Sequence, residues 1–453
     1  MPHLVIKDHP DLSTSIDILD KWIEHTMFKN HQPGLAIGIV HDGELLWGKG
    51  YGYADVDSKQ HVTLDTRFRI ASITKTFTAS AIMQLRDAGK LSLDDPVSKY
   101  LDWFTLRYAE APEITVRNLL THTSGLPRDS HGPMWTEYDA PEQDEFVSET
   151  SLRQPTRPPY DQYAYSNLGY SLLGDIIAAV SGQSWADYIQ QNILDPLDMS
   201  ETFPVPKADD PKLAKGYSRL NGAYERSAMN FFLMNSFEAS ANIASSVNDL
   251  VKYANFHLNK DKSPILSNHS LRDMHRIHWI YDKWDGGYGL GIEVHKVNDW
   301  IITGHTGGYP GYITAFMVCQ KQNTAVIVLT NALNSNPMQY VEQAYKLVLP
   351  EIIKATEAAK PKANPVWEKY AGEYIGDWGS LKVVIRGEQL QIISLDYMDM
   401  PPTILIPTPE ENVFTLQEAH QSNETARFEM NAEGKVVKLW TRNEYYSIKK
   451  TSS

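Results

Sequence analysis

The feature that constrains the fold most is a stretch in the first quarter of the chain that predicts a helix buried on every side. From Phe77 to Met83 each residue is apolar or small, and Gly89 can end the helix. A helix that is apolar all round packs inside a domain rather than on its surface. Its first turn nevertheless carries Ser72 and Lys75, which are three residues apart and therefore share one face. The domain must accommodate a hydroxyl and an amine at the mouth of this helix.

This serine–lysine pair has two interpretations. A lysine at the mouth of a buried helix is destabilising unless it has partners or loses its proton, and a neutral lysine beside a serine hydroxyl can make that serine a nucleophile. Alternatively, Ser72 caps the helix and Lys75 reaches solvent. The S-x-x-K spacing alone does not decide between them, because Ser447 and Lys450 repeat it near the C-terminus.

Length and charge limit the classes of protein to which this chain can belong. Its 453 residues predict more than one domain, because single hydrophobic cores stop growing beyond about 250–300 residues. The net charge of −14, with no offsetting cluster of Lys and Arg, argues against binding to nucleic acid or to an anionic membrane. The single cysteine, Cys319, excludes an intramolecular disulfide and lies in an apolar run, so we expect an inert, buried thiol.

Signals for secretion or membrane insertion are absent from the sequence as given. The N-terminus carries neither the basic segment nor the apolar core of a secretory signal, and no stretch is apolar for long enough to span a membrane. We therefore expect a cytoplasmic protein, although the mature chain of a secreted protein would show the same pattern.

Strand patterns lie at both ends of the larger, N-terminal part of the chain and enclose a mostly helical middle. The expected strands are Gly34–Val40, Glu44–Trp47, Tyr288–Val294, Trp300–Thr303, Tyr312–Cys319 and Thr324–Leu329, with amphipathic helices over 13–28 and 337–354. The economical arrangement is one antiparallel sheet built from both ends, covered by the terminal helices, with residues 70–285 as a helical lobe. A site would lie between lobe and sheet, and the segment 127–163, rich in Pro, Asp, Glu and Ser, would form a lid or pocket wall.

The remainder of the chain changes character after a segment rich in Ala, Lys and Pro. We place a first domain over 1–354, a linker over 355–365 and a second domain over 366–453. The second domain alternates short strand-like runs with tight turns, a pattern typical of a small closed barrel or meander. The expected strands are Leu381–Arg386, Gln389–Leu395, Val413–Leu416, Ala426–Met430, Val436–Trp440 and Tyr445–Ile448.

Three short motifs follow one another along the first domain. They are Ser72-Ile-Thr-Lys75 at the start of the buried helix, Tyr165-Ser-Asn167 where a loop enters a helix, and His305-Thr-Gly-Gly308 at the end of a strand. Each alone is a weak signal. A second Y-x-N begins at Tyr253 but falls inside an amphipathic helix, where we interpret the tyrosine as a surface residue.

Together with their flanking sequences, these motifs resemble those of the penicillin-recognising serine hydrolases. The similar segments extend across residues 15–350 and read F-R-I-A-S-I-T-K, L-L-T-H-T-S-G-L, Y-S-N-L-G-Y, S-S-V-N-D-L and G-H-T-G-G. That family contains class C β-lactamases, D-Ala-D-Ala carboxypeptidases, D-aminopeptidases and esterases. The resemblance implies an α/β, β-lactamase-like fold, with an antiparallel sheet flanked by helices and a helical lobe. The C-terminal region resembles, more weakly, the all-β lipocalin-like barrel that follows this fold in some members.

The resemblance also implies a role for each residue of the first two motifs. Ser72 would be the nucleophile that accepts an acyl group, and Lys75 would withdraw its proton. Tyr165, as a phenolate or by way of Lys75, would pass a proton to the leaving group and later activate water or another acceptor. Asn167 would hydrogen-bond to the substrate amide and to Lys75.

The third motif would bind the substrate. By the same resemblance His305, Thr306 and Gly308 line the substrate site, and the backbone N–H groups of Ser72 and Gly308 form the oxyanion hole. The β-lactamases of the family usually carry lysine where this chain has His305, and a mostly neutral ring would hold a substrate carboxylate less firmly. The pattern is closer to the peptidase and esterase branches. The alternative for His305 is a histidine packed between lobe and strand.

The motifs and their resemblance lead to one expected function and several alternatives. We expect a serine acyl-enzyme hydrolase that cleaves small peptides, amides or esters, including substrates with D-amino acids, without a cofactor or a metal. The alternatives are a class C-like β-lactamase, a peptidyl thioesterase or cyclase, and a catalytically inactive scaffold. The expected partner is a small-molecule or peptide substrate, with no nucleic acid and no membrane, and assembly into a homo-oligomer stays open.

Other histidines receive no role in this scheme. His269, His275 and His278 lie close in sequence, but no carboxylate–histidine motif surrounds them, so we interpret them as solvated residues rather than metal ligands. His122 resembles a loop element that shapes the fold of the family, and we assign it no catalytic role.

Overall fold

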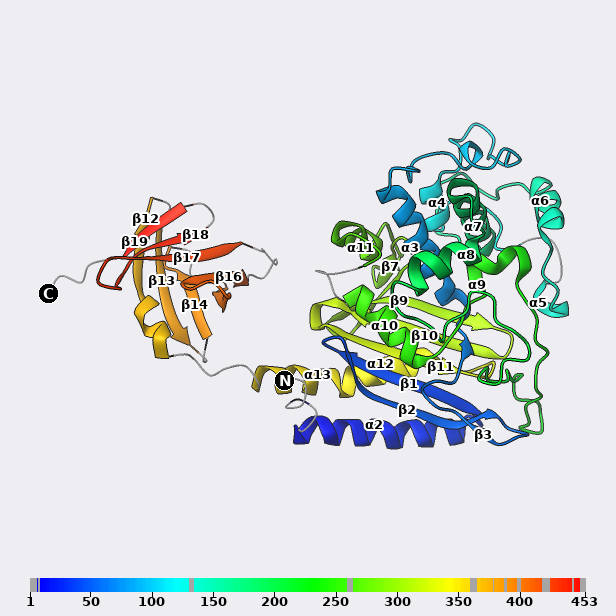
Figure 1. The fold of residues 1–453 in the computed structure, drawn as a ribbon, viewed down its shortest axis with the longest axis horizontal. Helices are drawn as coiled ribbons and strands as arrows, with labels where there is room; N and C mark the ends of the chain where they lie inside the picture. The colour runs from blue at the N-terminus through cyan, green and yellow to red at the C-terminus, as the bar shows by residue number, and fades with distance from the viewer. Residues whose placement is uncertain are drawn as a thin grey trace. The chain divides into compact units, whose positions relative to one another are not determined.

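The computed structural model describes residues 6, 9–129, 134–258, 264–358, 365–377, 379–386, 389–396, 401–417, 424–441 and 444–448. The chain divides into two compact units, Met1–Thr356 and Glu357–Ser453 (Figure 1). Most of the linker that we place over 355–365 lies outside the described residues, so its limits stay a proposal. No helix in the described ranges is both long and apolar enough to cross a membrane.

The first unit is built on a nine-stranded antiparallel sheet whose strands come from both ends of the unit. The strand order is β3-β2-β1-β11-β10-β9-β8-β7-β6. The strands are β1 (Gly34–His41), β2 (Glu44–Asp55), β3 (Gln60–His61), β6 (Trp279–Ile280), β7 (Gly286–Tyr288), β8 (Glu293–Val297), β9 (Trp300–Tyr309), β10 (Tyr312–Cys319) and β11 (Thr324–Thr330). β1 and β11 lie side by side within the sheet (Figure 1), and their pairing places Leu35 opposite Thr330. This arrangement confirms the sheet that the sequence predicts.

Alternation along the central strands directs their side chains into two separate cores. On β1, Leu35, Ile37 and Ile39 belong to one hydrophobic cluster, whereas Ala36 and Val40 belong to the other. Figure 1 shows the terminal helices of the unit along one face of the sheet, and they contribute residues to the first cluster. They are α2 (Pro10–Lys29), α12 (Pro337–Leu347) and α13 (Leu349–Ala358). A strand buried on both faces explains why its sequence is apolar at nearly every position.

The helix expected over 337–354 is instead two helices. Val348 is the C-cap of α12, and α13 begins at the next residue. Pro350 explains the break, because proline has no N–H to donate to the carbonyl of Lys346 and its ring crowds that carbonyl. Both helices turn apolar residues to the same cluster, including Val341 and Ile352, so the hydrophobic pattern does not reveal the interruption.

The strand expected over Tyr288–Val294 is also interrupted. β7 ends at Tyr288 and β8 begins at Glu293, and Gly291 between them has a φ of +73°. A Cβ at Gly291 would lie 2.5 Å from the Cβ of Ala79. The chain leaves the sheet here to pack closely against α3.

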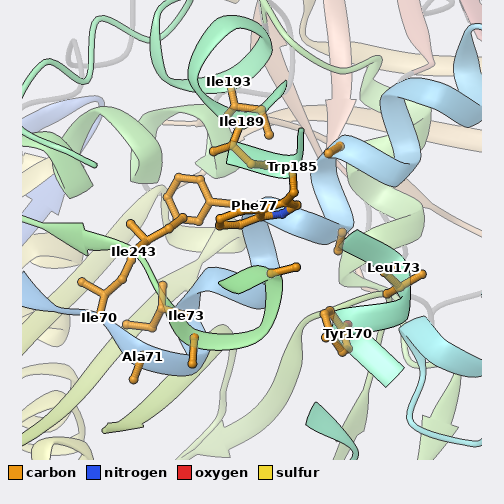
Figure 2. Packing of buried hydrophobic residues seen from close by; sticks show 14 of the residues in the cluster. Ile70, Ala71, Ile73, Phe77, Tyr170, Leu173, Trp185, Ile189, Ile193 and Ile243 are labelled. Carbon is orange, nitrogen blue, oxygen red and sulfur yellow. The ribbon is translucent and has the colours of Figure 1, made fainter. Parts of the chain in front are cut away.

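The second cluster fills a helical lobe on the opposite face of the sheet, around α3 (Thr74–Asp87). Every residue of α3 from its first to Met83 is buried, which confirms the prediction of a helix buried on all sides. Figure 2 shows Phe77 of α3 beside Trp185, whose indole N–H donates to Thr78 Oγ1 at 3.0 Å. The other helices of the lobe are α4 (Val116–Leu120), α5 (Met134–Glu137), α6 (Gln143–Ser151), α7 (Asn167–Ser181), α8 (Trp185–Ile189), α9 (Glu238–Ala241), α10 (Val247–Leu258) and α11 (Asn268–His275).

Tyr253 of α10 is buried, so our interpretation of it as a surface residue is wrong. Its ring stacks on Phe77 with the two centroids 3.8 Å apart, and its hydroxyl donates to Thr76 Oγ1 at 2.9 Å. α10 packs against the sheet and against α3 at the same time. Tyr253, which lies beside the main apolar stripe of α10, is therefore covered by α3.

The second unit is a closed barrel of eight antiparallel strands in sequence order, which confirms the expected all-β barrel. The strands are β12 (Gly372–Gly376), β13 (Gly379–Arg386), β14 (Gln389–Ser394), β15 (Thr403–Pro407), β16 (Val413–Gln417), β17 (Thr425–Met430), β18 (Val436–Thr441) and β19 (Glu444–Ile448). We did not predict β12 and β15, because glycines bound the first and prolines flank or end the second, and both residue types disfavour strands. Apolar side chains that include Tyr374 and Phe428 form the core of the barrel.

Candidate active site

Ser72 and Lys75 meet at the start of α3. Ser72 lies in a single 3-10 turn, Ala71–Ile73, that leads directly into the helix, and its side chain makes no helix-capping hydrogen bond. Lys75 lies in the first turn of α3 and is fully buried, with Nζ 3.3 Å from Ser72 Oγ. The interpretation in which Ser72 caps the helix and Lys75 reaches solvent is therefore wrong.

Two further oxygen atoms hold the Lys75 amine. Nζ lies 2.8 Å from Asn167 Oδ1 and 2.9 Å from the carbonyl oxygen of Ser240. Burial lowers the pKa of Lys75 well below its usual value, although the Asp129 carboxylate acts in the opposite direction. A neutral amine has two N–H groups, which these two oxygens can accept, and one lone pair, which is left for the hydroxyl proton of Ser72. This geometry suits a general base.

The orientation of Asn167 is fixed by a carboxylate that the sequence motifs do not indicate. Asn167 Nδ2 donates to Asp129 Oδ1 at 2.7 Å. Since a carboxylate only accepts hydrogen bonds, the amide oxygen must be the atom that faces Lys75. Asn167 is the first residue of α7, and the preceding Ser166 caps that helix by accepting the N–H of Gly169 at 3.0 Å. Asp129 belongs to the segment expected to form a pocket wall, and no spacing relates it to the motifs.

Tyr165 lies beside two basic side chains. The centre of its ring is 4.9 Å from Lys75 Nζ and 5.0 Å from the guanidinium carbon of Arg128. Burial raises the pKa of Tyr165 above its usual value and outweighs a hydrogen bond with Ser72 that lowers it. The phenol is therefore protonated in the resting protein, which favours proton transfer by way of Lys75 over a phenolate base.

His122 packs against Tyr165, with the two ring centroids 4.2 Å apart. Its Nδ1 accepts the backbone N–H of Ser166 at 3.0 Å, and the whole side chain is buried. Burial lowers the pKa of His122 well below its usual value, so the ring is neutral. His122 thus positions the second motif, in keeping with the structural role expected for it.

The third motif lies inside a strand rather than at its end. β9 extends over Trp300–Tyr309 and so continues well beyond the strand expected at Trp300–Thr303. Gly307 makes this possible, because a Cβ at this position would lie only 2.2 Å from the carbonyl oxygen of Ile70. The strand and the turn that carries Ser72 therefore approach each other backbone to backbone.

Gly308 is less confined by the protein itself than Gly307. A Cβ at Gly308 would meet only Ile313 Cδ1 within 4 Å, at an ordinary distance of 3.7 Å. The steric need for glycine thus lies one residue earlier. Gly308 itself is exposed next to this contact.

His305 is packed inside the protein. It is 1% exposed, its Nε2 lies 3.0 Å from the Tyr288 hydroxyl, and its Nδ1 faces the carbonyl oxygen of Thr306. Burial lowers the pKa of His305, while the Glu293 carboxylate, 3.6 Å from Nδ1, acts in the opposite direction. These are the contacts of a neutral, packed histidine rather than of a cation directed at a substrate carboxylate.

Glu293 is a second carboxylate that the sequence motifs do not indicate. Thr306 Oγ1 donates to its Oε1 at 3.0 Å, and His295 Nε2 lies 3.1 Å from its Oε2. Burial would raise the pKa of Glu293, but His305, His295 and Thr306 together lower it to about 2. Only the register of β8 against β9, in which Glu293 lies opposite Gly304, brings this negative charge beneath the third motif.

The three neighbouring histidines of the sequence do not converge on one point. His269 is exposed, whereas His275 is buried between His257 and Thr303, with hydrogen bonds of 2.8 and 2.7 Å. The interpretation of His275 as solvated is therefore wrong, because α11 turns this residue toward the sheet. Within the ranges that the structure describes, no three His, Cys, Asp or Glu side chains gather as metal ligands.

Comparison with known proteins relates the first unit to one family. Residues 19–349 match the family model described as Beta-lactamase. Protein flp of Staphylococcus aureus (strain N315) is 34% identical over 330 residues, which are 70% of this chain and 63% of flp. Beta-lactamase-like protein 2 of Dictyostelium discoideum is 28% identical over 360 residues, which are 77% of this chain and 65% of that protein. The matched regions thus span less than two thirds of either relative.

Solved structures are similar to the chain as well. An octameric penicillin-binding protein homologue from Pyrococcus abyssi has a TM-score of 0.67 at 27% identity, covering 95% of this chain and 99% of that one. A class C beta lactamase from Rhodobacter sphaeroides has a TM-score of 0.63 at 20% identity, covering 76% of this chain and 100% of that one. At 20% identity the second similarity concerns the fold alone.

Proposed function

The chain belongs to the β-lactamase family, and from this premise we propose that it is a serine hydrolase that forms an acyl-enzyme on Ser72. The observation that carries the proposal is the buried Lys75 amine, 3.3 Å from Ser72 Oγ and held by two oxygen acceptors. Burying an amine in this way is destabilising unless the site uses it. This argues against a catalytically inactive scaffold.

Acylation needs one proton to travel from the nucleophile to the leaving group. Ser72 Oγ attacks the carbonyl carbon of the substrate while its proton passes to Lys75 Nζ. The backbone N–H groups of Ser72 and Gly308 stabilise the oxyanion of the tetrahedral intermediate. Lys75 then returns the proton through the Tyr165 hydroxyl to the leaving group, whose bond to the carbonyl carbon breaks. Ser72 is left as an ester.

Hydrolysis of that ester reverses the proton path. Water attacks the ester carbonyl as Tyr165, backed by Lys75, takes its proton, and Ser72 recovers a proton when it leaves. Asn167, held by Asp129 at 2.7 Å, keeps the Lys75 amine oriented through both half-reactions.

We propose small peptides, amides or esters as substrates, including those with D-amino acids, in preference to β-lactams. A neutral His305 and the negative charge of Glu293 disfavour a substrate carboxylate at the third motif. The similarity to an octameric homologue over 95% of this chain supports a further proposal, that the chain assembles into a homo-oligomer.

Covalent labelling tests the proposal directly. The protein is treated with a fluorophosphonate or a fluorescent penicillin and its intact mass is measured. We expect one adduct on the native protein, none on Ser72→Ala, and an unchanged adduct on the matched control Ser447→Ala, which alters the exposed serine of the second S-x-x-K. Reaction with the fluorophosphonate alone would favour the esterase or amidase assignment, and rapid turnover of penicillin a β-lactamase. Absence of any adduct would refute the hydrolase proposal.

A further inference from the structure

Arg69 is a buried cation without a carboxylate partner. It is 1% exposed and donates to the carbonyl oxygen of Phe232 at 3.0 Å and to Asn242 Oδ1 at 2.8 Å. Among the described residues no carboxylate lies within ion-pair distance of its guanidinium. Its further polar neighbour is the Tyr309 hydroxyl, and its buried Nε–H has no acceptor. A buried cation with unused N–H groups is destabilising until an anion joins it.

The guanidinium of Arg69 borders a recess. This recess opens to solvent and has a cavity volume of about 80 Å³, several times what a single water molecule needs. Its walls also include Gly216, Met229, Asn230, Tyr309 and Pro310. The Tyr309 ring lies under the guanidinium carbon at 4.1 Å. Lys215, another wall residue, already pairs with the carboxylates of Asp55 at 2.9 Å and Asp57 at 3.8 Å, so Arg69 is the wall cation whose charge no described carboxylate balances.

Two residues of the recess lie close in sequence to the two residues of the proposed oxyanion hole. Arg69 lies three residues before Ser72, and Tyr309 directly follows Gly308 on β9. The leaving group of a substrate would face Tyr165, which supplies its proton from the lobe. The part of the substrate that continues along β9 past Gly308 toward the recess is therefore its acyl part.

We propose that the Arg69 recess binds a carboxylate carried by the acyl group of the substrate. This inference rests on the proposed acyl-enzyme chemistry at Ser72. A carboxylate is favoured because its two oxygens match the planar fork of a guanidinium, and because one cation is available to one negative charge. The enzyme would thus prefer acyl donors that end in an acid over neutral donors of equal length.

Matched pairs of esters test this preference for acid-terminated acyl donors. Nitrophenyl monoesters of succinic, glutaric and adipic acid are compared with nitrophenyl esters of neutral acids of the same chain length. We expect kcat/KM to be at least tenfold higher for one of the acid esters than for its neutral match. Equal values throughout the series, with Ser72-dependent turnover of the neutral esters, would refute the recess and leave the hydrolase proposal intact.

Two variants test whether the preference for acid esters over neutral esters arises at the Arg69 recess. Arg69→Gln removes the cation but alters a buried residue, so the exposed Asn230→Asp supplies a second variant that places a competing carboxylate on the wall. Both should lower the ratio of kcat/KM for the acid ester to kcat/KM for its neutral match at least tenfold. Asn221→Asp makes the same change on an exposed residue outside the recess and should leave the preference unchanged.

A binding measurement tests the anion site independently of acyl-enzyme formation on Ser72. Glutarate should raise the melting temperature of the Ser72→Ala protein more than sodium chloride of equal ionic strength does, and Asn230→Asp should abolish the difference. If no ester is turned over but glutarate still stabilises the protein in this way, the hydrolase proposal fails and the anion site stands. If glutarate and sodium chloride act alike, the anion site is refuted.

Discussion

Gly307 lies where β9 contacts the turn that carries Ser72. An alanine at this position should force the strand and the turn apart. The added Cβ would lie 2.2 Å from the carbonyl oxygen of Ile70 and 2.3 Å from Thr314 Oγ1, whereas ordinary contact begins near 3.4 Å. The carbonyl of Ile70 cannot rotate away freely, because it accepts hydrogen bonds from the N–H of Ile73 and from Thr314 Oγ1. One segment must therefore move by about 1.2 Å.

A displacement of this size predicts a loss of activity larger than the loss of stability. Misplacing reacting groups by about 1 Å lowers rates about 100-fold, and overpacking a site of this kind costs about 1–3 kcal/mol of folding free energy. We expect Gly307→Ala to lower kcat/KM for a nitrophenyl ester, and the rate of fluorophosphonate labelling, about 100-fold while the protein still melts cooperatively. Gly308→Ala is the matched control, since its Cβ would make an ordinary contact at 3.7 Å. Activity of Gly307→Ala within threefold of the native value, or an equal loss in Gly308→Ala, would show that this contact does not set the geometry of the site.

Three further changes test the site and the core. Lys75→Met removes the general base and should lower the acylation rate, measured as the burst of nitrophenol, about 1,000-fold; a loss below tenfold would point to another base. Trp185→Phe removes the 3.0 Å hydrogen bond to Thr78 and part of a packed ring. It should lower the free energy of unfolding, measured in urea, by about 1–3 kcal/mol. An unchanged value would mean that the core relaxes around the smaller side chain. Burial lowers the pKa of His257 well below 6.5, so below pH 6.5 the unfolded chain binds more protons than the folded protein. The free energy of unfolding therefore decreases as the pH is lowered. His257→Gln should flatten the decline of the melting temperature between pH 7 and 5, and the exposed His269→Gln should not; parallel slopes for native protein and His257→Gln would contradict this account.

The buried helix and the sheet could be predicted because their signals are local. Residues 77–83 are apolar or small without a break, and β10 is a run of strand-forming residues between two turns, so its limits Tyr312–Cys319 agree with the structure. The break before α13 and the extension of β9 could not be predicted from such local signals. The first depends on one proline in an otherwise helical pattern, and the second on a glycine that is a strand breaker in isolation but fits where two backbones meet.

The two carboxylates of the site could not be predicted for a related reason. Asp129 reaches Asn167 across 38 residues of chain, and Glu293 reaches Thr306 only because β8 and β9 pair in one particular register. A motif records residues that are neighbours in sequence, whereas these contacts are made by tertiary structure. The same holds for Arg69, whose lack of a carboxylate partner among the described residues becomes visible only once its surroundings are known.

The pairing of β1 with β11 has a consequence for how the chain is synthesised. β1 leaves the ribosome long before its partner in the sheet, since Thr330 is the residue opposite Leu35. At about 5–20 residues per second, roughly 15–60 s pass before that partner is made. Throughout this interval an apolar strand that is buried on both faces in the finished protein has its β11 edge unpaired. Chains stalled between these two strands should therefore be held by chaperones or aggregate, while chains released after Thr330 should close the sheet.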